Sequence, residues 1–196
     1  MKTGIYGGTF SPVHNGHVRA AELFLEKLSL DRLIIMPAGI PPHKEVTQKV
    51  DGAIRYEMCL AAFLPLSDKV EVSDFEIKKD GKSYTIDTAR HFEGDELWIL
   101  CGEDMLLSLD TWYRADELMR RCSFAALSRT LGENEKMRLH AEKLRDEYGA
   151  VIEIIDAEPF EVSSTEIREK VKSGEDISSL VPGGVLEIIN DRNLYR

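Results

Sequence analysis

Short apolar runs alternate along this chain with longer amphipathic stretches, and this alternation limits the possible folds more than any other feature. Strands are predicted at residues 2–6, 32–36, 70–72, 75–77, 96–101, 123–127 and 151–155. Apolar residues at helical spacing predict helices from about 15, from 51, over 83–90 after a strand end, over 106–110, 115–120 and 133–148, through 172, and around 185–189. This order predicts an α/β fold, a Rossmann-like, mainly parallel sheet with helices on both faces, in a single domain over residues 1–196.

Composition excludes several classes of protein. Hydrophobic residues make up 43% of the chain and charged residues 31%, which is typical of a soluble globular protein. No apolar run approaches the roughly 20 residues of a membrane span, and no secretory signal is visible, so we expect a cytoplasmic protein without a membrane partner. A net charge of −10 argues against nucleic-acid binding, which needs a basic surface. Without CxxC spacing, Cys59, Cys101 and Cys122 are expected to be buried, reduced thiols.

A glycine turn joins the first strand to the first helix. Gly7 and Gly8 follow Tyr6, and His14 and His17 then lie at the start of the helix. Glycine lets a backbone approach an anion closely, and a helix N-terminus offers unpaired N–H groups and the positive end of its dipole. The P-loop and GxGxxG patterns are both absent. The sequence therefore predicts a different kind of phosphate site at this turn.

The histidine pair by itself leaves three interpretations open. Two such histidines more often belong to a core or a surface than to a site. A zinc site would need further ligands, and no HExxH or cysteine cluster supplies them. Phosphate binding fits the glycine turn that precedes His14 and His17, because imidazole N–H groups donate to phosphoryl oxygens whether the ring is neutral or cationic.

A second candidate segment lies at residues 162–168. Ser163 and Glu166 have the spacing of a capping box, which by itself accounts for a helix start. The same helix start also suits a phosphate, with Ser164 and Thr165 lining its open end. Arg168 would then grip a phosphate through two N–H bonds, although an isolated helix arginine is usually solvated.

Both segments resemble signatures of the nucleotidyltransferase superfamily that carries an (H/T)xGH motif. They read Gly7-Gly8-Thr9-Phe10-x-Pro12-x-His14-x-Gly16-His17 and Val162-Ser-Ser-Thr-Glu-Ile-Arg168. The chain is also similar to nicotinate-nucleotide adenylyltransferases in Pro41-Pro42-His43-Lys44, Ser83-Tyr-Thr-Ile-Asp-Thr88, Gly102-x-Asp104 followed by Trp112, Leu180-Val-Pro182 and Leu194-Tyr195. The resemblance therefore covers essentially the whole chain.

This resemblance implies adenylyl transfer from ATP to nicotinate mononucleotide, which gives deamido-NAD and pyrophosphate. The catalytic residues it implies are His14, His17 and Arg168. The ATP site would also contain Gly8, Thr9, Phe10, Gly102, Asp104, Ser163, Ser164 and Thr165. Nicotinate mononucleotide would contact Lys44, Thr85, Trp112 and Arg129, with Trp112 stacked on the nicotinate ring. Mg²⁺ would arrive with ATP and would need no dedicated protein ligands.

Other interpretations follow from the residues and from departures from the family pattern. Trp112 also suits a core position, and Asp104 suits a helix N-cap. Ser11 replaces a common aspartate or asparagine, Glu103 a common alanine, and residues 128–130 the more usual Arg-Pro-Gly. The alternative functions are adenylyl transfer to nicotinamide mononucleotide or phosphopantetheine, a non-catalytic nucleotide-binding module, and a dinucleotide-binding oxidoreductase, which the missing GxGxxG opposes. A homo-oligomer is compatible with the sequence.

Overall fold

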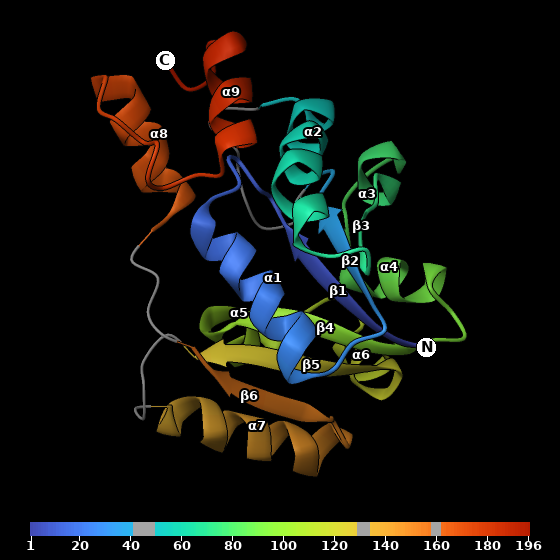
Figure 1. The fold of residues 1–196 in the computed structure, drawn as a ribbon. Coiled ribbons are helices and arrows are strands. Elements are labelled where there is room, and N and C mark those ends of the chain that lie inside the picture. The colour runs from blue at the N-terminus through green and yellow to red at the C-terminus, as the bar shows by residue number, and fades with distance from the viewer. Residues whose placement is uncertain (41–49, 129–133, 158–161) are drawn as a thin grey trace.

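A computed structural model describes residues 1–40, 50–128, 134–157 and 162–196 (Figure 1). Its strands are β1 (Lys2–Gly8), β2 (Arg32–Pro37), β3 (Val70–Val72), β4 (Glu96–Gly102), β5 (Cys122–Ser128) and β6 (Ile152–Asp156). They form a six-stranded sheet in the order β3-β2-β1-β4-β5-β6, and each neighbouring pair is parallel. The predicted α/β fold with a parallel sheet is confirmed.

Helices cover both faces of this sheet (Figure 1). One core cluster contains residues from α1 (Asn15–Lys27), α2 (Gly52–Phe63), α8 (Ser164–Ser173) and α9 (Gly183–Asp191). The other contains residues from α4 (Thr85–His91), α5 (Glu103–Leu107), α6 (Ala115–Arg121) and α7 (Glu135–Tyr148). The remaining described helices are α3 (Phe75–Lys78) and the 3₁₀ turns η1 (Leu64–Leu66) and η2 (Leu109–Thr111).

Strand β2 shows why the central strands read as continuous apolar runs. Its Leu33 and Ile35 pack into the first core cluster, whereas Ile34 and Met36 pack into the second. Successive side chains of a strand point to opposite faces, so a strand covered by helices on both sides must be apolar at every position. Burial on both faces is therefore the physical origin of the run at residues 33–36.

Two predicted elements are wrong in type or position. Residues 75–77, predicted as a strand, belong to helix α3. The Glu76 side chain in this helix is buried and accepts a hydrogen bond from Thr88 Oγ1 at 2.6 Å. The helix predicted at 106–110 begins earlier, as α5, because Gly102 both ends β4 and serves as the N-cap of α5. The 3₁₀ turn η2 follows α5.

The sheet divides between β1 and β4 at its carboxyl edge. The pairing of these two strands ends at Ile5 and Ile99. Beyond that point β1 stays paired with β2 as far as Gly8, and β4 stays paired with β5 as far as Gly102. The last three residues of β1 and β4 therefore part from each other. In open parallel sheets, ligands bind at such a switch point, beyond the carboxyl ends of the strands.

The three cysteines agree with the prediction made from their spacing. Cys59, Cys101 and Cys122 are free and buried, as predicted. Burial raises the pKa of Cys101 and of Cys122 to about 12, so both thiols stay protonated at neutral pH.

Within the described ranges, every helix is too short or too polar to cross a membrane.

The backbone after β2 has no space for a side chain at Gly39. A Cβ added there would lie 2.1 Å from the backbone oxygen of Glu76. We expect Gly39→Ala to lower the free energy of unfolding by about 1–3 kcal/mol, because a backbone must move to accept it. Urea denaturation measures this change. Gly183→Ala is the control, since its added Cβ at the start of α9 meets nothing within 4 Å; equal stabilities of the two variants would contradict the expectation.

Candidate functional site

Two histidines cap the first turn of α1. His14 is the N-cap, and its side chain accepts a hydrogen bond from the backbone N–H of His17, with Nδ1 at 3.3 Å. In return, His17 Nδ1 accepts from the backbone N–H of His14 at 3.2 Å. The rings stack with their centroids 3.6 Å apart. This is a capping box built from two imidazoles. Because each Nδ1 is an acceptor, the proton of each neutral ring is assigned to Nε2.

The turn before α1 is held in place by its own phenylalanine. The Phe10 ring is 2% exposed and packs edge-on against Tyr6 and Phe63, with centroids 5.4 and 5.6 Å away. A Cβ on Gly8 would lie 2.8 Å from this ring, so the position requires glycine. Phe10 itself has a φ of 51°, in the left-handed region. Phe10 can therefore offer a ligand its backbone groups but not its buried side chain.

The second motif contacts the first across most of the chain. Ser164 Oγ donates to the carbonyl of Pro12 at 2.8 Å, and Arg168 Nη1 donates to the carbonyl of Ser11 at 2.8 Å. Arg168 Nη2 also donates to Thr165 Oγ1 at 3.0 Å. The guanidinium is thus fixed beside the loop that leads directly into His14. The two predicted phosphate-binding segments come together in space.

Helix α8 begins as the capping-box spacing predicts. Ser163 is its N-cap, and Ser163 Oγ accepts from the backbone N–H of Glu166 at 3.1 Å. The hydroxyl groups of this motif are therefore engaged in the structure itself: Ser163 caps the helix, Ser164 binds the first motif, and Thr165 accepts from Arg168. Their side chains hold the helix start and the arginine in place.

The backbone at the ends of β1 and β4 has free space beside its glycines. A Cβ added to Gly7 or to Gly102 would meet nothing within 4 Å. Gly102 is the N-cap of α5, so the N-cap interpretation of Asp104 is wrong, and Asp104 lies exposed in the first turn. Both glycines stand where β1 and β4 part, which places Asp104 close after the switch point of the sheet.

Two of the predicted nicotinate residues, Thr85 and Trp112, lie on segments that contact each other. Thr85 begins α4 as predicted, and Trp112 follows η2. Their neighbours Tyr84 and Tyr113 bring these segments together, with ring centroids 4.5 Å apart. Trp112 is partly buried against the second core cluster, so its core interpretation holds in part.

The two groups of residues pack on opposite faces of the sheet. Phe10 and Val13, in the loop before the histidines, belong to the first core cluster, whereas Tyr84 and Trp112 pack against the second. The structure therefore places Trp112, and Tyr84 beside Thr85, against a different core cluster from the loop that precedes His14. Lys44 and Arg129, the other two predicted nicotinate residues, lie outside the described residues.

Arg55 supports the site without having been predicted. This arginine is 6% exposed, and its Nη1 donates to the carbonyl of Thr9 at 2.8 Å. Longer bonds of 3.4 Å reach the carbonyls of Val50 and Gly39. Desolvation by burial lowers the pKa of Arg55. Its sequence signal was a lone charge at helical spacing within the buried face of α2, beside Met58, Cys59 and Ala62.

In the sequence, Tyr195 stands out only as part of the pair Leu194-Tyr195, which resembles the ending of the adenylyltransferases. Its side chain is 6% exposed, and its hydroxyl lies 3.1 Å from Ser11 Oγ. No local pattern marks this contact, because the two residues stand 184 positions apart in the sequence.

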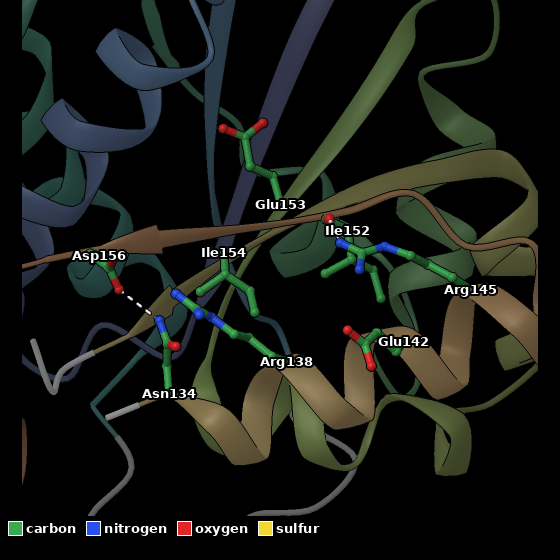
Figure 2. A pocket seen from close by; sticks show the side chains of 8 residues that line it. All are labelled: Asn134, Arg138, Glu142, Arg145, Ile152, Glu153, Ile154 and Asp156. Carbon is green, nitrogen blue, oxygen red and sulfur yellow. Dashed lines mark hydrogen bonds between the residues drawn. The ribbon is translucent and has the colours of Figure 1, made fainter. Parts of the chain in front are cut away.

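A groove elsewhere in the molecule is separate from these residues. It lies between α7 and the outer edge of β6 (Figure 2) and is lined by Asn134, Arg138, Glu142, Arg145, Ile152, Glu153, Ile154 and Asp156. Arg145 donates to the carbonyl of Ile152 at 2.5 Å, and Asn134 Nδ2 donates to Asp156 Oδ1 at 2.8 Å. The first of these bonds occupies a backbone carbonyl of the edge strand. Its described lining contains none of the predicted site residues.

Comparison with known proteins gives concordant results. The chain matches the cytidylyltransferase-like family over residues 5–170. A probable nicotinate-nucleotide adenylyltransferase of Clostridium tetani is 39% identical over 199 residues, which covers 100% of this chain and 99% of the relative. A protein of the same name from a Thermoanaerobacter species is 38% identical over 201 residues, covering 100% and 95%. The Plasmodium falciparum nicotinic acid mononucleotide adenylyltransferase complexed with NaAD has a TM-score of 0.76 at 16% identity, covers 99% and 97%, and supports the fold.

The capping geometry predicts the tautomer of both histidines. In alkaline buffer, where imidazoles are neutral, we expect His14 and His17 to carry the proton on Nε2, because Nδ1 accepts a backbone N–H. Long-range ¹H–¹⁵N NMR correlations distinguish the two tautomers. His140, which lies on α7, serves as an internal reference. A proton on Nδ1 of either capping ring would contradict the described geometry.

Proposed function

This chain belongs to the nicotinate-nucleotide adenylyltransferase family, and we propose that it transfers the adenylyl group of ATP to nicotinate mononucleotide. The products are deamido-NAD and pyrophosphate. The observation that carries the proposal is the contact between the two motifs. Arg168 donates to Ser11, three residues before His14, so a permanent cation and a histidine-capped helix start lie at one edge of the sheet.

The reaction needs positioning and charge stabilisation more than proton transfer. An oxygen of the mononucleotide phosphate attacks the α-phosphorus of ATP in line. The new P–O bond forms as the bond to the bridging oxygen breaks, and pyrophosphate leaves with that electron pair. Since a phosphate monoester is already an anion, the attack requires no general base. Such a reaction is accelerated by fixed donors aimed at the oxygens where charge develops.

The residues of the first and second motifs are assigned to the triphosphate. His14 and His17 would donate from Nε2 to oxygens of the α- and β-phosphates, the orientation that their capping bonds favour. The backbone of Gly8, Thr9 and Phe10 would follow the phosphates closely. Arg168 would bind the leaving pyrophosphate with the remaining N–H groups of its guanidinium. Ser163, Ser164 and Thr165 stay predicted residues of the ATP site, and the bonds of their hydroxyls within the protein would position them there.

The adenosine of ATP and the nicotinate ring of the mononucleotide are assigned to separate segments. Gly102 and Asp104, at the parting of β1 and β4, would contact the adenosine. Thr85 would hydrogen-bond the nicotinate group, and Trp112 would stack on its ring, which its partial burial at the surface of the second core cluster allows. Lys44 and Arg129 stay predicted contacts of the mononucleotide.

Mg²⁺ is proposed to accompany the triphosphate. Among residues 1–40, 50–128, 134–157 and 162–196, no group of three or more His, Cys, Asp or Glu side chains is arranged to hold a metal ion. The imidazole and guanidinium groups of the two motifs are hydrogen-bond donors that suit phosphate oxygens. When bound to ATP, Mg²⁺ would neutralise charge on the phosphate oxygens. We also propose a cytoplasmic location, which the free, buried cysteines support, because disulfides are rare in a reducing compartment.

Competing acceptors test the reaction. The chain is incubated with ATP, Mg²⁺ and one of three acceptors: nicotinate mononucleotide, nicotinamide mononucleotide or phosphopantetheine. We expect pyrophosphate release and deamido-NAD formation with the nicotinate compound at the highest kcat/KM. A higher kcat/KM with phosphopantetheine would contradict the proposal. ATP binding without pyrophosphate release for any acceptor would indicate a non-catalytic nucleotide-binding module.

The role of the capping imidazoles is tested at His17. His17→Gln keeps an acceptor that can reach the N–H of His14 but removes the imidazole donor. We expect kcat to fall about 100- to 1000-fold, as for the loss of one oxyanion donor, while thermal stability changes little. Steady-state kinetics and a melting curve measure the two effects. His140→Gln, on α7, is the matched control and should keep wild-type kcat; a similar kcat for both variants would refute the assignment.

A further inference from the structure

The last residues of the chain return to the loop before α1. Tyr195 lies in the first core cluster, and its Oη is 3.1 Å from Ser11 Oγ. The carbonyl of the same Ser11 accepts the 2.8 Å bond from Arg168 Nη1. Ser11 therefore links Tyr195 to Arg168: its side chain meets the tyrosine, and its backbone meets the guanidinium.

Residues on both sides of this contact have backbone conformations that favour glycine. After α9 ends, Asn193 has a φ of 51° and Tyr195 a φ of 64°, both in the left-handed region. Across the contact, Phe10 has a φ of 51°. Side chains other than glycine rarely occupy this region and stay there only where the surrounding structure demands it. The Tyr195 and Phe10 rings are both buried, at 6% and 2% exposure.

The buried hydroxyl is suited to hold a loop. Desolvation by burial raises the pKa of Tyr195, although the hydrogen bond with Ser11 and the nearby guanidinium groups of Arg168 and Arg55 act in the opposite direction. A protonated phenol can donate one hydrogen bond and accept another. The two guanidinium groups that influence Tyr195 are also those that donate to the loop, Arg55 to Thr9 and Arg168 to Ser11.

We propose that Tyr195 is a positioning residue for the phosphate site: its hydroxyl fixes Ser11, and Ser11 fixes the guanidinium of Arg168. Tyr195 touches no substrate and acts through the loop alone. The chain end thus becomes part of the machinery that binds the triphosphate. This inference rests on the proposed function, in which Arg168 binds the leaving pyrophosphate.

Tyr195→Phe tests the role of the hydroxyl, because it keeps the buried ring and removes one hydrogen-bonding group. We expect kcat/KM for ATP to fall about five- to tenfold, the equivalent of one hydrogen bond. The KM for nicotinate mononucleotide should stay within about twofold, since that site is assigned to segments on the other face of the sheet. Tyr148→Phe, at the end of α7, is the matched control and should leave both quantities unchanged.

A double-mutant cycle tests whether the hydroxyl acts through Ser11. Ser11→Ala should cause a loss similar to that of Tyr195→Phe. The double variant should also lose only about five- to tenfold, because either change alone already breaks the pair. A double loss near the product of the two single losses would overturn the proposal. So would wild-type kinetics for Tyr195→Phe, or a rise in KM for both substrates together with a lower melting temperature.

Failure of the proposed function can be told apart from failure of this inference. If the wild-type chain releases no pyrophosphate with any acceptor, the proposed function is wrong. Calorimetric titration with ATP and Mg²⁺ then decides the inference by itself. An ATP Kd about five- to tenfold weaker in Tyr195→Phe than in Tyr148→Phe supports the positioning role, and equal Kd values overturn it.

Discussion

At the carboxyl edge of the sheet, the structure of the site depends on hydrogen bonds to the backbone carbonyls of one loop. Residues 9–12 form neither helix nor strand, and their carbonyls accept from distant side chains: Thr9 from Arg55, Ser11 from Arg168 and Pro12 from Ser164. Buried carbonyls need such partners, since an unpaired one costs free energy. Two of the donors are cations, so the bonds that order the loop also bring positive charge to the proposed phosphate site. A chain of net charge −10 must supply that charge locally.

The first turn of α1 uses each imidazole for two purposes. Nδ1 completes the capping box and thereby satisfies backbone N–H groups at the helix start. The same bond orients the ring and assigns the donor role to Nε2, the atom proposed to bind phosphate. Local folding and the proposed chemistry thus depend on opposite nitrogens of one ring. A serine cap would begin the helix equally well but would supply no second donor.

The sequence predicts those features that leave a local pattern. Burial of β2 on both faces produces an unbroken apolar run, and the glycine turn before His14 marks the end of β1. The strand predicted at 75–77 is wrong because a segment this short leaves no clear period, and its buried carboxyl, Glu76, pairs with the distant Thr88. Arg55 left a weak signal, a charge on an apolar helix face. The pairing of Tyr195 with Ser11 left none, since it joins residues 184 positions apart in the sequence.

The central claim is that the imidazole cap and Arg168 bind one triphosphate. A crystal structure of the chain with an uncleavable ATP analogue and Mg²⁺ tests it most directly. We predict phosphate oxygens within about 3 Å of His17 Nε2 and, in the same molecule, of an Arg168 nitrogen. A triphosphate bound in the groove between α7 and β6, or held by only one of these two groups, would contradict the account.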